Sequence, residues 1–167
     1  MPEELNIEVG EPIPNSFDYT LTPAELDKQL SEKMALVRRG ELQATHEFTM
    51  LGYALDFIDF AKNSVNVELN FDEDSLEPYC EILGEMQMSF AQEPPPADMM
   101  TGIIKGATGF FGVMVIKNLG GNWAQSNIGM AVIRNGTSAF IMNRVGRFLQ
   151  SGEDDMSALY NYLKTEV

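Results

Sequence analysis

The sequence is poor in cysteine: Cys80 is the only one among 167 residues. A single cysteine excludes a disulfide within the chain, which fits a reducing compartment. Folding must therefore depend on a hydrophobic core, and an apolar fraction of 44% is enough to build one in a single domain of this length. The acidic, proline-bearing start has no basic segment followed by an apolar run, so no secretory signal is expected. We expect a cytoplasmic protein in which residues 1–20 form a loosely ordered acidic arm and residues 21–167 a single domain.

Basic residues are also scarce, with 11 lysines and arginines against 25 acids and a net charge of −14. Such a chain lacks the basic footprint that nucleic-acid phosphates require, so nucleic acid is excluded as a partner. The acids are unevenly placed, because none occurs from Met99 to Gly152. Five bases fall in this acid-free stretch: Lys105, Lys117, Arg134, Arg144 and Arg147. The stretch is either the core-forming half of the domain or a local basic patch for an acidic ligand or partner.

Catalytic and metal-binding motifs are missing. His46 is the only histidine, and Met50 stands where an HExxH zinc motif would need its second histidine. No GxSxG nucleophile motif occurs. The stretch from Asn70 to Glu81 has acids at some calcium-loop positions, but Ser75 replaces the required glycine. We therefore expect no catalytic residues, no metal and no cofactor, and an enzyme is the less favoured alternative.

One apolar run, from Met99 to Ile116, is long enough to raise the question of a membrane span. It is slightly shorter than the about 20 residues that a spanning helix needs, and Lys105 would lie in mid-membrane. A helix that is apolar nearly all round also fits the centre of a soluble core, where its glycines allow close packing. We therefore expect residues 99–118 to form a central core helix and the protein to be soluble.

Local patterns predict further elements on both sides of this helix. Thr22 and Pro23 begin a helix that ends near Gly40, and a second helical pattern covers residues 42–62. Residues 65–71 alternate between apolar and polar side chains, as in a half-buried strand. A helix that Asp74 or Ser75 caps follows this strand, residues 91–98 form a proline-rich spacer, and Asp98 caps the central helix.

Asn135-Gly136 predicts a two-residue type I′ turn in a hairpin after Trp123. This register pairs Arg134 with Thr137, Val132 with Ala139 and Met130 with Ile141. Two short helices, residues 144–150 and 154–164, are expected to end the chain. The fold class is therefore α+β, with a small antiparallel sheet packed by helices.

The segment GFFGVMVIKNLGGNW, residues 109–123, resembles a pattern in small, mostly uncharacterised bacterial α+β domains. In that pattern an apolar helix of the form aromatic-x-Gly-Glu-x-x-x leads into Asn-x-Gly-Gly-x-Trp and a hairpin. The terminal segment from Val145 to Tyr160 is similar to the end of the pattern, and the resemblance covers about residues 72–163. Some members are immunity-like, meaning that they neutralise toxins. The acid of the pattern is Val113 here, so a ligand site that depends on it would be lost.

Acidity, the missing catalytic motifs and the resemblance together favour a non-enzymatic protein-binding module, with an immunity-like role as one form of it. A basic protein is the expected partner, and Glu68, Glu81 and Glu85 are the expected contact residues, because helix capping does not require them. The alternative is a small-ligand-binding protein or enzyme with a pocket near Trp123 and Arg134 or Arg144. The oligomeric state stays open, a dimer included.

The methionines offer a second kind of interaction surface. Four of the eleven flank the proline-rich spacer: Met86, Met88, Met99 and Met100. Flexible thioether side chains can line an adaptable binding surface or fill gaps in a core, and the sequence alone favours core filling.

Overall fold

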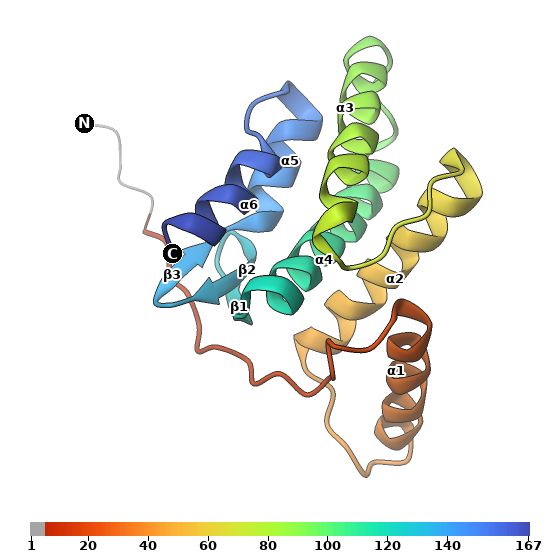
Figure 1. Ribbon diagram of the computed structural model, residues 1–167, viewed down its shortest axis with the longest axis vertical. Coiled ribbons are helices and arrows are strands. Elements are labelled where there is room, and N and C mark those ends of the chain that lie inside the picture. Colours follow the sequence, from red (N-terminus) through yellow and green to blue (C-terminus); the bar gives the residue numbers. More distant parts are fainter. Residues whose placement is uncertain (1–5) are drawn as a thin grey trace.

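The computed structural model describes residues 6–167 and has six α-helices and a three-stranded antiparallel sheet in this range (Figure 1). The helices are α1 (Pro23–Arg38), α2 (His46–Val65), α3 (Leu76–Gln92), α4 (Ala97–Leu119), α5 (Ile141–Ser151) and α6 (Met156–Thr165), with a 3₁₀ turn η1 (Glu73–Ser75) before α3. The strands are β1 (Asn122–Ser126), β2 (Gly129–Arg134) and β3 (Thr137–Ala139), in that order across the sheet. The predicted α+β class is confirmed.

Helix α4 is the centre of the fold, as predicted for residues 99–118. It lies between α2 on one side and the α5–α6 pair on the other (Figure 1), and every residue from Gly106 to Ile116 is buried. A Cβ atom at Gly109 would lie 2.6 Å from the carbonyl oxygen of Met50, so α2 and α4 approach more closely than any larger residue would permit. The predicted cap is wrong, however, because the helix begins at Ala97 with Pro96 as its N-cap rather than at Asp98.

The hairpin register is confirmed near the turn, where Arg134 pairs with Thr137 and Val132 with Ala139. Asn135 and Gly136 both have positive φ, 48° and 77°, as a type I′ turn requires. The predicted pairing of Met130 with Ile141 is wrong, because β3 ends at Ala139 and Ile141 already begins α5. Met130 instead pairs with Gln125 of β1, on the other side of β2.

The predicted strand at residues 65–71 is also wrong. Val65 ends α2, Asn66 adopts the left-handed conformation at its C-terminus, and residues 67–71 belong to no strand. Leu69 and Phe71 are nevertheless buried while Glu68 is exposed. The alternating pattern therefore reflects alternating burial against the helices, and not sheet pairing.

The described part of the expected acidic arm, residues 6–20, runs along the free edge of β1. The Gly10 amide donates to the carbonyl of Gln125 and the Ile13 amide to that of Trp123, each at 2.8 Å. Farther along, the buried carboxylate of Glu47 accepts hydrogen bonds from the Ser16 amide and hydroxyl and from the Tyr19 hydroxyl. The described part of the arm is thus attached to both the sheet and α2.

Candidate functional site

An apolar groove opens between α2, α3 and α4. Its lining is almost entirely carbon and sulfur, and it encloses about 380 Å³. Phe57 and Gly106 form the buried floor, and the partly or fully exposed walls are Phe60, Met86, Met99, Gly102 and Ile103. Met99 leaves 56% of its surface exposed. A concave apolar surface with flexible walls can accept an apolar side chain of another molecule.

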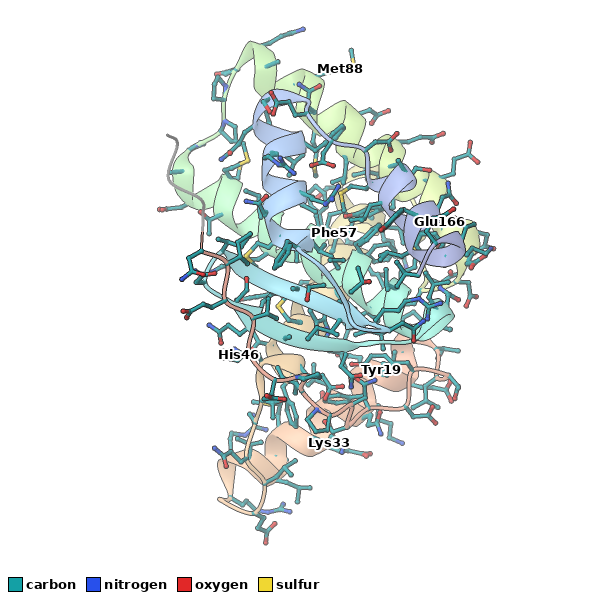
Figure 2. All side chains as sticks on the ribbon, turned by 90° about the vertical axis from the view of Figure 1, so that its left-hand side faces the viewer. Tyr19, Lys33, His46, Phe57, Met88 and Glu166 are labelled. Carbon is teal, nitrogen blue, oxygen red and sulfur yellow. The ribbon has the colours of Figure 1, made fainter. Side chains whose placement is uncertain are left out.

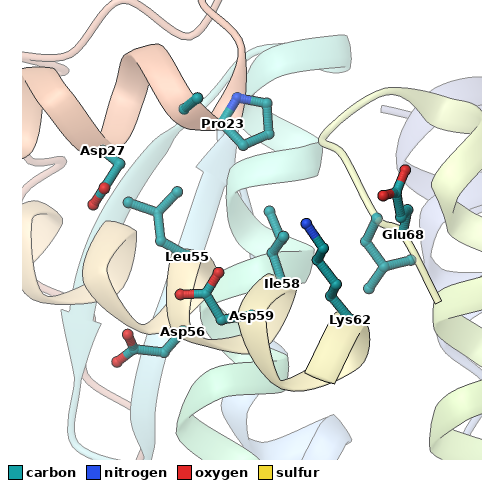
Figure 3. A pocket seen from close by; sticks show the side chains of 10 residues that line it. Pro23, Asp27, Leu55, Asp56, Ile58, Asp59, Lys62 and Glu68 are labelled. Atoms are coloured by element: carbon teal, nitrogen blue, oxygen red, sulfur yellow. The ribbon is translucent and has the colours of Figure 1, made fainter. Parts of the chain in front are cut away.

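A second, acidic hollow lies on the neighbouring side of α2 (Figure 3). Asp27 of α1 and Asp56 and Asp59 of α2 line it, together with Glu68 from the segment that follows α2. Asp56 lines both the hollow and the apolar groove, so the two concave surfaces are adjacent at this residue. We call this pair of surfaces the groove and the acidic hollow.

The carboxylates of the acidic hollow have no ion-pair partner within residues 6–167. Lys62 also lines the hollow, but its ammonium forms no salt bridge with Asp27, Asp56 or Asp59. Partial burial of the carboxyl group, and then the negative charges of Asp59 and Asp27, raise the pKa of Asp56 above its usual value. A cation that entered the hollow would therefore relieve an existing repulsion among the three aspartates.

The structure separates the three glutamates that the sequence suggested as contact residues. Glu68 is exposed at the acidic hollow. Glu81 is exposed on α3 and lines a different hollow with Glu73 and Glu77. Glu85, one helical turn beyond Glu81, is exposed and lines neither surface. Of the three, only Glu68 therefore lines the acidic hollow, and none of them lines the groove.

The residues of the alternative ligand pocket, Trp123, Arg134 and Arg144, make contacts within the fold. Trp123 is completely buried, and its indole Nε1 has no hydrogen-bond partner within the described chain. The Arg134 guanidinium donates to the carbonyls of Leu119 and Leu163, which lie at or near the ends of α4 and α6. The Trp123 ring and the Arg134 guanidinium are therefore both engaged in contacts that stabilise the fold.

Arg144, the other arginine of that alternative, is also engaged within the fold. It forms an ion pair with Asp154 at 2.9 Å, and the Arg147 guanidinium contacts the same carboxylate at 2.6 Å. Asp154 is mostly buried and joins α5 to the segment before α6. The two arginines therefore hold the last two helices together.

Residues 6–167 contain no cluster of three or more histidine, cysteine or acidic side chains with the geometry of a metal site. The Cys80 thiol is partly buried, and this burial raises its pKa to about 11, so it is protonated at neutral pH. A protonated thiol is a weak nucleophile. These side chains do not form a recognisable catalytic arrangement.

Helix α4 is also the one helix in the described range that is long and apolar enough to cross a membrane. More than half of its most apolar window, 56%, is buried against the rest of the protein. A buried core helix passes the same length and composition test, so the helix is compatible with a soluble protein.

The sequence pointed to single residues of both surfaces: Glu68 of the acidic hollow was an expected contact residue, whereas core filling was the favoured role for the methionines of the groove. Met86 and Met99 were recognised as members of a methionine group beside the proline-rich spacer. Asp56 and Asp59 lie one turn apart on α2, which is a visible signal, but Asp27 joins them only because α1 packs on α2. That long-range packing has no local signature in the sequence.

Comparison with known proteins leaves the groove and the hollow as the main evidence about function. No family model, curated protein or solved structure matches this chain.

Proposed function

We propose that this chain is a non-enzymatic, cytoplasmic protein-binding module. Its partner is a basic amphipathic segment that places an apolar side chain in the groove and a lysine or arginine in the acidic hollow. The observation that carries this proposal is that Asp56 lines both surfaces, which places an apolar site next to a group of carboxylates without ion pairs in the described chain. A toxin with a basic surface would be one such partner, in line with the immunity-like domains that the sequence resembles.

The groove supplies the affinity in this proposal. Anchor side chains that enter a desolvated apolar pocket carry most of the binding energy of protein interfaces. Met86 and Met99 can change rotamer at little cost, so the walls can adapt to an aromatic or branched anchor. An amphipathic helix with anchors on one face is a common ligand for a groove of this kind.

The acidic hollow supplies orientation and association rate. Asp27, Asp56 and Asp59 present three carboxylates to one side of the groove, and the chain as a whole carries a charge of −14. Charge complementarity speeds association with a basic partner and fixes its orientation, and both effects weaken as salt is added. A basic partner is therefore favoured over a neutral or acidic one.

Two matched glycine variants test this proposal. A Cβ atom at Gly102 of α4, or at Gly84 of α3, would meet no other atom within 4 Å. Gly102→Phe fills the groove, whereas Gly84→Phe adds the same ring to a helix outside it. Both variants replace a helical glycine at a position where an added Cβ meets no other atom within 4 Å, so both should fold.

The wild-type protein and both variants are used to capture partners from the native host, and bound proteins are quantified by mass spectrometry. A specific partner should be lost with Gly102→Phe and retained with Gly84→Phe. Its binding should also weaken with Asp56→Lys and with rising salt. A partner that all variants retain would show that the groove is not its binding surface, and salt-independent binding would remove the role of the acidic hollow.

A further inference from the structure

Lys105 differs from the other bases of the acid-free stretch. Within the described chain, Lys117 pairs with Asp72, both Arg144 and Arg147 pair with Asp154, and Arg134 donates to backbone carbonyls. No carboxylate of residues 6–167 forms an ion pair with Lys105. Its ammonium group instead lies 5.9 Å from the ring centroid of Tyr53. The aromatic face attracts this cation and holds it in place.

Lys105 lines a third hollow, of about 370 Å³, between α2, α4, the sheet and α5. The polar side chains around it include His46 and Thr49 of α2 and Gln125 of β1, which are all exposed. No acid lines this hollow, in a chain whose surface is otherwise strongly acidic. The hollow therefore combines an unpaired cation with polar side chains that can donate hydrogen bonds.

The remaining wall is apolar and consists largely of methionine. Met50, Met130 and Met142 come from α2, β2 and α5, and all three line the hollow. Met142 is held close to the sheet, because a Cβ atom at Gly129 would lie 3.2 Å from its sulfur atom. Thioether groups make favourable contacts with aromatic rings and adapt to irregular apolar shapes.

We propose that this third hollow binds a small organic carboxylate, with the carboxylate at Lys105 and His46 and the apolar body against Met50, Met130 and Met142. The ammonium of Lys105 supplies a charge-assisted hydrogen bond, and Gln125 and Thr49 can satisfy the second carboxylate oxygen. The methionines exclude water from the apolar part of the ligand. A neutral analogue of the same shape retains the apolar contact and loses the charge-assisted bond.

This ligand site is separate from the proposed protein-binding surface. The groove and the third hollow share no lining residue. In Figure 2 His46 lies below the strands, whereas Phe57, the floor of the groove, lies above them. The two proposals can therefore fail independently: evidence against protein binding at the groove does not affect the carboxylate site, and evidence against the carboxylate site does not affect the groove.

Nuclear magnetic resonance of methionine methyl groups tests the proposal. Benzoate and 4-methylpentanoate are the carboxylate probes, benzamide is the neutral probe, and acetate is a carboxylate without a sizeable apolar body. Benzoate or 4-methylpentanoate should shift the methyl signals of Met50, Met130 and Met142 with a saturable dependence on concentration, and the signals of Met86 and Met99 should stay unchanged. Benzamide and acetate should each bind at least about tenfold more weakly, since a charge-assisted bond and a buried apolar body each contribute that much.

Two variants locate the charge. Lys105→Gln should weaken binding of the effective probe at least about tenfold, whereas Lys28→Gln removes an equal charge from the exposed surface of α1 and should leave it unchanged. His46→Gln should weaken the binding of the carboxylate probes and leave the binding of benzamide unchanged. The proposal is overturned if neither carboxylate probe gives saturable shifts, if benzamide binds as well as benzoate, or if Lys105→Gln binds like the wild-type protein.

Discussion

The indole ring of Trp123 lies directly over Gly112 of α4. It occupies the space that a side chain at position 112 would need, because a Cβ atom there would overlap the six-membered part of the ring. Trp123 is completely buried at the start of the sheet, so the ring has little room to move away. This contact fixes how close the sheet lies to the central helix.

Gly112→Ala should lower the free energy of unfolding by about 1–3 kcal/mol, because the added methyl group overpacks a rigid part of the core. Urea unfolding followed by tryptophan fluorescence and circular dichroism measures the change. Gly102→Ala is the matched control, since position 102 lies in the same helix beside open space. The control should be neutral or stabilising by up to about 1 kcal/mol, through helix propensity alone. Equal stability of the two variants would contradict the close contact between Trp123 and Gly112.

The attachment of the arm depends on Tyr19 and Glu47. The Tyr19 hydroxyl donates to the Glu47 carboxylate at 2.7 Å, and Glu47 is completely buried. Tyr19→Phe should lower the free energy of unfolding by about 1.5–3 kcal/mol, the usual range for a lost hydrogen bond to a charged group. Tyr162→Phe removes an equivalent hydroxyl from an exposed ring and should have no effect. Hydrogen exchange should rise in residues 6–20 with Tyr19→Phe; unchanged exchange there would show that the arm is held mainly elsewhere.

The hairpin turn gives a third test. Gly136 has a φ of 77°, which a residue with a side chain adopts only at a cost. Gly136→Ala should therefore lower the free energy of unfolding by about 1 kcal/mol, and no steric clash contributes, because no atom lies within 4 Å of the added Cβ. Thermal unfolding of Gly136→Ala beside Gly84→Ala, a helical glycine with equally open surroundings, separates the conformational cost from other effects. A similar melting temperature for both would contradict the turn geometry.

Glu73 predicts a pH dependence of stability. It accepts hydrogen bonds from Lys164 at 2.9 Å and Tyr160 at 2.8 Å, and these bonds lower its pKa below the usual 4.5. Since the folded-state pKa is the lower one, the ionised group stabilises the fold above about pH 4.5, and this contribution is lost as the pH falls through the folded-state pKa. Glu73→Gln should therefore lower the free energy of unfolding at pH 7, by at most about 1 kcal/mol because the pair is largely exposed.

The difference between the wild-type protein and Glu73→Gln should shrink as the pH is lowered from 5 to 3. Urea unfolding at several pH values measures it. Glu85→Gln, which removes an exposed charge with no ion pair in the described range, serves as the control. A difference that is constant with pH would show that the Glu73 carboxylate does not contribute through its charge.

Local signals were sufficient for the elements that depend on neighbouring residues. The apolar run of α4 and the Asn135-Gly136 turn each follow from a few consecutive residues, and both were predicted correctly. The strand predicted at residues 65–71 was wrong. An alternating apolar pattern indicates alternating burial, but it does not show whether another strand lies alongside to pair with it. The start of α4 was misplaced because Asp98 is a common N-cap residue, whereas Pro96 occupies the N-cap position without a side-chain hydrogen bond.

The candidate sites were harder to predict, because they depend on contacts between distant segments. Arg134 looked available for a ligand, since nothing in the sequence shows that two backbone carbonyls would accept its hydrogen bonds. In the sequence Lys105 is one of five bases in the acid-free stretch. Only the fold shows that the other four bond to carboxylates or backbone carbonyls, whereas Lys105 lies over the Tyr53 ring. The acidic hollow likewise needs Asp27 of α1 beside Asp56 of α2.

The attachment of the arm to β1 has a consequence for the order in which the chain folds during synthesis. Residues 6–15 are synthesised more than 100 residues before the groups in and around β1 to which they bond. Contacts between such distant residues form slowly, because a long loop must close before they can contribute. While α1 to α4 are synthesised, residues 6–15 therefore cannot yet bond to the sheet, although Ser16 and Tyr19 can already bond to Glu47 of α2. The edge of β1 can be covered only after residues 122–127 have emerged, so this contact cannot assist the formation of the helices that precede the sheet.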